Sequence, residues 1–122
     1  MAPRAVAVAG RVLGRGGRFC VCVPHPFSRS GEFESRVDDA PFTVAGSYLA
    51  ETDYELAGDR GGIAFRFVSR RFPLESCSRA LGSAGIAIEV VPEPPLPAVE
   101  RHRRTRIPVF LMWGAVRVAS DD

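Results

Sequence analysis

The sequence predicts an all-β protein in which two sheets pack face to face as a sandwich. Short segments alternate apolar and polar residues with the period of two that strands show, as in Phe19-Cys20-Val21-Cys22-Val23. Glycine and proline interrupt these segments at short intervals, as they do in turns between strands. No stretch of about ten residues has the 3.6-residue period of an amphipathic helix. Many short strands separated by turns favour a sandwich.

Five strands are expected after a short N-terminal segment. Residues 1–16 are small and glycine-rich, and we expect a loosely ordered arm with one short strand at residues 5–8. The five strands share the alternating pattern and stop at glycine or proline; they are residues 19–23, 33–37, 42–45, 63–74 and 86–91. Residues 47–56 fit either an edge strand or a loop, and the glycines of residues 58–62 interrupt the chain. Residues 76–83 are expected to be a connection with one helical turn at most.

The C-terminal part has a different composition. Four of the six residues 92–97 are proline, which predicts an extended, semi-rigid spacer. The basic residues 101–106 are interpreted as a solvated tail, because the interleaved aromatic residues of a nucleic-acid patch are missing. We therefore divide the chain into an N-terminal arm (1–16), a folded domain (17–92) and a proline-rich, basic extension (93–122).

The overall composition is that of one ordinary folded domain. The chain has 122 residues, of which 46% are hydrophobic and 25% charged. Its formal net charge of +2 gives no reason to expect a nucleic-acid or membrane partner. Apolar runs such as residues 109–113 are far shorter than the roughly 18 residues of a membrane span. Three cysteines, an odd number, suit a reducing compartment, so we expect a cytoplasmic protein that can also be nuclear.

Several motifs, taken in order, are similar to those of a known family. Residues 17–23 and Phe27-Ser28 resemble its opening strand and turn, and residues 62–74 match its pattern of glycine followed by Arg-x-Phe-x-Arg-x-Tyr/Phe-x-Leu. Residues 85–90 and Ile107-Pro108-Val109 resemble its later Gly-x-Leu-x-Ile strand and its C-terminal Ile-x-Ile/Val motif. Over residues 17–109 the chain thus resembles the small heat-shock proteins (Hsp20, α-crystallin). This resemblance implies an immunoglobulin-like two-sheet sandwich, the α-crystallin domain.

The resemblance also implies a function. Small heat-shock proteins are ATP-independent chaperones, or holdases, which bind unfolding proteins during stress and prevent their aggregation. Such a protein needs no catalytic residue, no metal and no cofactor, so we expect no enzyme. Its partners would be unfolding client proteins and other copies of the chain, in a homodimer, a larger homo-oligomer or a hetero-oligomer with related chains. The alternative is an adaptor or co-chaperone-like module with one partner on the same fold.

Two arginines would form the dimer interface. By resemblance, Arg70, with Arg66 beside it, is the family's interface arginine and pairs with carboxylates of the partner subunit. Three acidic residues of this chain are candidates for those carboxylates: Asp53, Glu55 and Asp59. Without the resemblance, Arg70 would be interpreted as a solvated residue on an outward face.

Ile107 and Val109 would anchor the C-terminal tail. In an extended segment these two side chains point the same way, with Pro108 between them. They could enter a groove at the edge of a neighbouring subunit, as other strand-like peptides do. The alternative is a C-terminal strand that folds back on its own domain. The resemblance favours the intermolecular interpretation.

The cysteines and histidines allow two further hypotheses. Cys20-x-Cys22-x-x-His25 is reminiscent of a zinc motif, but zinc needs about four ligands, and only Cys77 and His102 remain to complete the set. We therefore expect no metal, and buried cysteines often serve as small apolar residues. The three cysteines Cys20, Cys22 and Cys77 could instead form redox-dependent cross-links between subunits. No base can be placed for a Cys–His protease.

Overall fold

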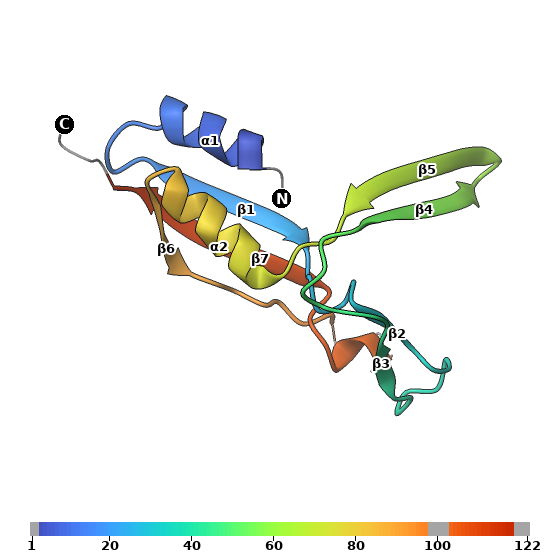
Figure 1. Ribbon diagram of the computed structural model, residues 1–122. Coiled ribbons are helices and arrows are strands. Elements are labelled where there is room, and N and C mark those ends of the chain that lie inside the picture. Colours follow the sequence, from blue (N-terminus) through green and yellow to red (C-terminus); the bar gives the residue numbers. More distant parts are fainter. Residues whose placement is uncertain (1–2, 98–102, 119–122) are drawn as a thin grey trace.

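The computed structural model describes residues 3–97 and 103–118, and it contains helices as well as strands (Figure 1). In chain order the elements are α1 (Pro3–Val12), β1 (Arg18–Pro24), β2 (Gly31–Phe33), β3 (Phe42–Val44), β4 (Asp53–Arg60), β5 (Ile63–Arg70), α2 (Leu74–Ser83), β6 (Ile86–Val90), the 3-10 turn η1 (Arg103–Thr105) and β7 (Phe110–Arg117).

A three-stranded sheet in the order β1-β7-β6 forms the body of the molecule. β7 pairs antiparallel with both neighbours, so β1 and β6 run parallel to each other. The helices α1 and α2 lie beside each other on one face of this sheet (Figure 1). The described part of the chain is therefore an α/β fold, and the predicted all-β, immunoglobulin-like sandwich is wrong.

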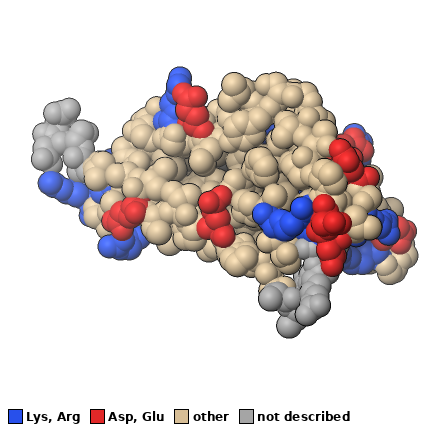
Figure 2. All heavy atoms as spheres, turned by 90° about the horizontal axis from the view of Figure 1, so that it is seen from below, with Lys and Arg blue, Asp and Glu red and all other residues tan. Residues whose placement is uncertain are grey.

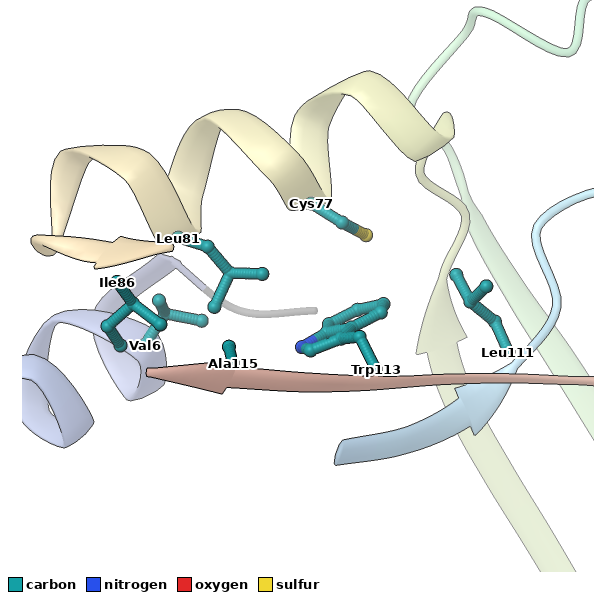
Figure 3. Close-up of a cluster of buried hydrophobic side chains, with 7 residues drawn as sticks. All are labelled: Val6, Cys77, Leu81, Ile86, Leu111, Trp113 and Ala115. Atoms are coloured by element: carbon teal, nitrogen blue, oxygen red, sulfur yellow. The ribbon is translucent and has the colours of Figure 1, made fainter. Parts of the chain in front are cut away.

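The core lies between the two helices and the face of the sheet that they cover (Figure 3). Each fully buried large side chain contributes roughly 1.5–3 kcal/mol to the free energy of unfolding. The buried cluster draws on both helices and on strands β6 and β7: Val6, Cys77, Leu81, Ile86, Leu111, Trp113 and Ala115. Segments expected to form an N-terminal arm and a C-terminal extension both supply residues to it.

Helix α2 occupies a segment that was expected to be a connection. Cys77 and Leu81 are four residues apart, so both lie on the helix face that packs against the sheet. Pro73 immediately precedes the helix, and Glu75 lies in its first turn, where a negative charge complements the helix dipole. Contacts with the sheet therefore stabilise a helix in a segment whose serines and glycine are weak helix formers.

Helix α1 replaces the expected loose arm and short strand. The spacing of its two buried residues, Val6 and Gly10, is four, which is the helical repeat. Arg117 of β7 closes the C-terminal end of this helix. Its side chain donates to the carbonyl oxygens of Gly10 and, at 2.6 Å, of Leu13. A cation at this position also complements the helix dipole.

The hairpin β4–β5 extends away from the body (Figure 1). Its two-residue turn, Gly61-Gly62, has φ angles of +61° and +81°, a conformation that favours glycine. β4 continues to Arg60, so the expected interruption at residues 58–62 is confined to this turn. At Gly58 a β-carbon would lie 2.6 Å from the ring of Phe65, so a larger residue there would have to displace that ring.

The small sheets do not pack face to face as a sandwich requires. β4–β5 and β2–β3 are each two-stranded and separate from the central sheet. Several apolar residues of the expected strands are consequently exposed: Val37, Val44, Val68, Leu74 and Ile88. Others do pack on the actual core: Phe19, Val21, Val23, Phe72 and Ile86.

Candidate functional site

The carboxyl ends of β1 and β6 bring a histidine and a glutamate together. Because these two strands are parallel, their carboxyl ends lie at the same edge of the sheet. His25 follows the last residue of β1, and Glu93 lies three residues beyond β6. The His25 Nε2 and Glu93 Oε2 atoms are 2.6 Å apart. In open α/β sheets this edge is where ligands bind.

The imidazole ring of His25 is held from both sides. Its Nδ1 atom accepts a hydrogen bond of 3.0 Å from the backbone N–H of Phe27. A nitrogen that accepts carries no proton, so the proton is on Nε2 and is donated to Glu93. The ring is buried, whereas the Glu93 side chain is 53% exposed. The backbone of His25 is fixed as well, because its N–H donates to the carbonyl oxygen of Val109 at 2.8 Å.

This pair lies in the wall of an apolar pocket of about 460 Å³. The described lining residues come from the ends of β1 and β6, the loop after β1, β3 with the loop that follows it, and the segment before β7: His25, Phe27, Ser30, Val44, Tyr48, Glu93 and Pro108. Phe27 stacks on Phe42 of β3 with ring centroids 5.2 Å apart. The Tyr48 hydroxyl accepts the N–H of Leu74 at 2.8 Å. Both aromatic walls are thus fixed by the rest of the fold.

A larger hollow of about 740 Å³ lies along the helices and the loop that carries Leu49. Its carboxylates already have partners within the chain. Glu51 accepts from the Ser76 hydroxyl at 2.7 Å, and Glu75 pairs with Arg79 one helical turn away. None of its described lining residues comes from the carboxyl end of β1 or β6. We therefore take the pocket at His25 and Glu93 as the candidate site.

The predicted interface arginines pair within their own hairpin. Arg66 binds Glu55 at 2.8 Å, and Arg70 binds Asp53, which is directly opposite in the strand register, at 3.1 Å. Asp59 accepts the N–H of Gly62 in the turn instead. All four charged side chains of the two pairs are largely solvated, where such pairs add about 0–1 kcal/mol. Two of the three carboxylates named from the sequence are thus intramolecular partners.

The predicted tail anchor lies next to the candidate site. Ile107 and Val109 are half-buried and lead directly into β7, the central strand of the sheet. Val109 binds His25 through its carbonyl oxygen, and Pro108 lines the pocket. The segment folds back on its own domain, as the alternative interpretation proposed.

The three cysteines are free and differ in exposure. Cys20 and Cys22 are exposed on the sheet face opposite the helices, whereas Cys77 is buried in the core. Of the three, only Cys20 and Cys22 lie where another subunit could reach them, and a cross-link between subunits stays a prediction. His25 binds Glu93 rather than approaching these thiols. In residues 3–97 and 103–118 no three Cys, His, Asp or Glu side chains are grouped as metal ligands.

The burial of Cys77 leads to a test with a thiol reagent. Transfer out of water disfavours the thiolate, and this raises the pKa of Cys77 above its usual value. We expect two thiols to react promptly with Ellman's reagent at about pH 8 and the third to be about 100-fold slower, because it must wait for local opening. Cys77→Ala should abolish the slow phase alone. Three equally fast thiols would contradict this burial.

The sequence reasoning missed Glu93 and gave His25 only as a zinc ligand. The sequence does contain a signal, because each of the two residues directly follows a proline at or just beyond the end of an apolar strand: Pro24-His25 and Pro92-Glu93. It becomes informative only once β1 and β6 are known to be parallel. Nothing in the local pattern says so, because β7, which separates them, comes later in the chain.

Neither the distribution of charged side chains nor the hydropathy of the helices helps to locate the site. On the face seen in Figure 2, basic and acidic side chains lie in small groups of mixed sign, with broad uncharged surface between them. Neither described α-helix has the length and apolar composition needed to cross a membrane.

The fold is similar to that of two solved structures. One is an S-adenosylmethionine-dependent methyltransferase from Mesorhizobium loti, with a TM-score of 0.70 and 21% identity over 94% of this chain and 55% of that chain. The other is a putative S-adenosylmethionine-dependent methyltransferase from Listeria monocytogenes, with a TM-score of 0.74 and 18% identity over 98% of this chain and 55% of that chain. This chain thus spans about half the length of either protein. No family model and no curated protein matches it.

These matches overturn the small heat-shock resemblance. Two proteins described as methyltransferases share nearly the whole fold of this chain, and an α-crystallin sandwich does not describe it. The predictions of a holdase, of an adaptor on the same sandwich and of unfolding clients as partners depended on that resemblance and are wrong with it. The expectation of a non-enzyme is likewise contradicted by the description of both neighbours as enzymes.

Proposed function

We propose that this chain forms the acceptor-binding part of an S-adenosylmethionine-dependent methyltransferase. One observation carries the proposal: the fold is similar to that of two proteins described as methyltransferases, and it has a pocket at the carboxyl ends of the parallel strands β1 and β6. The pocket would hold the molecule that receives the methyl group. A cytoplasmic location, expected from the cysteines, stays a prediction.

The described residues do not fit the cofactor itself. On doubly wound folds, adenosine-containing cofactors are held by a glycine-rich loop that follows a strand and opens a helix. Here residues 14–17, which contain three glycines, follow helix α1 and precede strand β1, the reverse order. The strand-to-helix connection after β5, residues 71–73, has no glycine. The cofactor site would therefore have to be supplied from outside residues 3–97 and 103–118.

Strand β1 and the uncovered sheet face offer a place for such a cofactor-binding unit. β1 is an edge strand, so one row of its backbone groups is available for another strand. The face opposite the helices carries Cys20, Cys22 and Met112, all exposed. An antiparallel sheet can leave one face open to solvent, so this face is available to such a unit. A unit that extends the sheet beyond β1 could cover this face as well.

The test joins this chain to the part of the Listeria monocytogenes protein that the structural match leaves out. Because that part would extend the sheet at β1, we expect the chimera to unfold cooperatively, to bind one S-adenosylmethionine by calorimetry, and to transfer a tritiated methyl group to a small acceptor. The unjoined chain is the control, and we expect it to bind no cofactor.

The outcome of the transfer assay decides the proposal. The acceptors assayed would include an amine, a phenol and a carboxylic acid of similar size, so that a negative result does not depend on one choice. A chimera that folds and binds the cofactor, but methylates none of them, would contradict the assignment of an acceptor site to this chain.

A further inference from the structure

Among the described residues that line the candidate pocket, one charge is uncompensated. Glu93 is the only acidic residue of this described set, which contains no Arg or Lys. His25 does not neutralise this carboxylate, because the ring accepts a hydrogen bond at Nδ1 and so carries a single proton, on Nε2. The pocket is therefore negative at one point of its wall.

Glu93 has one oxygen held and one available. Oε2 accepts from His25, whereas Oε1 meets no hydrogen-bond donor within the described part of the chain. The half-exposed side chain keeps this second oxygen accessible from the pocket. A carboxylate fixed on one side and open on the other is suited to accept a charge-assisted hydrogen bond from a ligand.

The remaining walls favour an apolar ligand body with a cationic end. Phe27, Val44 and Pro108 offer apolar surface, and the ring faces of Phe27 and Tyr48 can also attract a cation. The volume of about 460 Å³ is within the usual range for small-molecule sites. A ligand with a carboxylate would face Glu93 with a like charge, which disfavours that class.

We propose that this pocket binds a small molecule in which an apolar or aromatic body carries an amine. Glu93 recognises the amine through Oε1, and His25 is a positioning residue that holds the carboxylate through Oε2. The inference rests on the proposed function in one respect: this amine would be the methyl acceptor. Binding itself needs no cofactor and can be measured on the full chain alone.

The probe is 2-phenylethylamine, compared with 3-phenylpropionate and 2-phenylethanol as analogues of similar shape. We expect the amine to bind best in calorimetry at about neutral pH and to shift the Phe27 amide signal in NMR spectra. Glu93→Gln should weaken amine binding by about tenfold or more, because a charged partner is lost. Glu89→Gln is the matched control, because Glu89 pairs with Arg18 and does not line the pocket.

Several outcomes would overturn the inference. The first is that the Glu93→Gln variant binds the amine as tightly as the unchanged protein does. The second is that 3-phenylpropionate binds as well as the amine. The third is that no amine binding is seen up to about 10 mM, where a ligand of this size should be detected. Circular dichroism checks that both glutamine variants keep the fold.

The positioning role of His25 needs its own pair of variants. His25→Gln keeps a side-chain N–H donor for Glu93, whereas His25→Leu keeps volume without a donor. We expect amine affinity to fall several-fold in the leucine variant and to be largely restored in the glutamine variant. Equal affinity in both, with both folded, would contradict positioning through this hydrogen bond.

The two proposals fail in different ways. If the amine binds but the chimera methylates no acceptor, the proposed function is contradicted and the amine site stands. If the amine does not bind but the chimera methylates a phenol or a carboxylic acid, the amine site is contradicted and the methyl-transfer proposal stands.

Discussion

Replacement of Trp113 by alanine is expected to lower the free energy of unfolding by about 3–5 kcal/mol. Trp113 is 2% exposed and lies at the centre of the buried cluster, below Cys77 of α2 (Figure 3). Its register partner on β1 is Val21, which packs against the same cluster. Loss of the indole would leave a cavity between helix and sheet that neither side can close without moving. A change of this size is a large fraction of the stability of a small domain.

Met112 is the matched control, because it precedes Trp113 in the same strand and faces the other side of the sheet. It is 38% exposed, so Met112→Ala should cost less than about 1.5 kcal/mol. Urea unfolding followed by circular dichroism measures both variants. If the two changes cost the same, the assignment of the core to the helix-covered face is contradicted.

The strands were predicted better than the architecture. The positions of β1, β3, β5 and β6 agree with the segments in which apolar and polar residues alternate. This alternation arises because successive side chains of a strand point to opposite faces of the sheet, one more exposed than the other. The same alternation occurs in sandwiches and in mixed α/β sheets. Motifs such as Arg66-x-Val68-x-Arg70 therefore resembled a sandwich family although the hairpin that carries them extends away from the body.

The helices were missed because their apolar faces are narrow. α1 buries Val6 and Gly10, and α2 buries Cys77 and Leu81, so each has only two fully buried positions. Alternating valine and alanine in α1 also imitates a strand. The period becomes clear only when glycine and cysteine are counted as buried residues. Tertiary contact with the sheet, rather than local preference, then decides in favour of helices.

The candidate site depends on long-range pairing that the sequence does not display. His25 and Glu93 are 68 residues apart and meet only because β7 inserts between β1 and β6. Residues 109–113 form an apolar run in the sequence, yet the place of β7 as the central strand follows from its pairing with two segments far away in the chain. The polar character of the site could be read from single residues, but its geometry could not.

The packing of the two helices leads to the last prediction, in which one substitution has opposite effects at two glycines. At Gly10 of α1, a β-carbon would lie 2.5 Å from the carbonyl oxygen of Ala84. That oxygen belongs to the backbone at the end of α2, and the Ala84 N–H is itself bound to the carbonyl oxygens of Ala80 and Leu81. Gly10→Ala must therefore push α1 away from α2. We expect a loss of about 1–3 kcal/mol in the free energy of unfolding.

At Gly82, in the last turn of α2, a β-carbon would meet no atom within 4 Å. Alanine there only reduces the conformational freedom of the unfolded chain and improves helix propensity, so Gly82→Ala should stabilise the protein by about 0.5–1 kcal/mol. At Gly10 the same gain in propensity is smaller than the cost of the backbone clash. Urea denaturation of both variants, followed by circular dichroism, should therefore move the two midpoints in opposite directions. Two stabilised variants would mean that α1 does not pack against the end of α2 at Gly10.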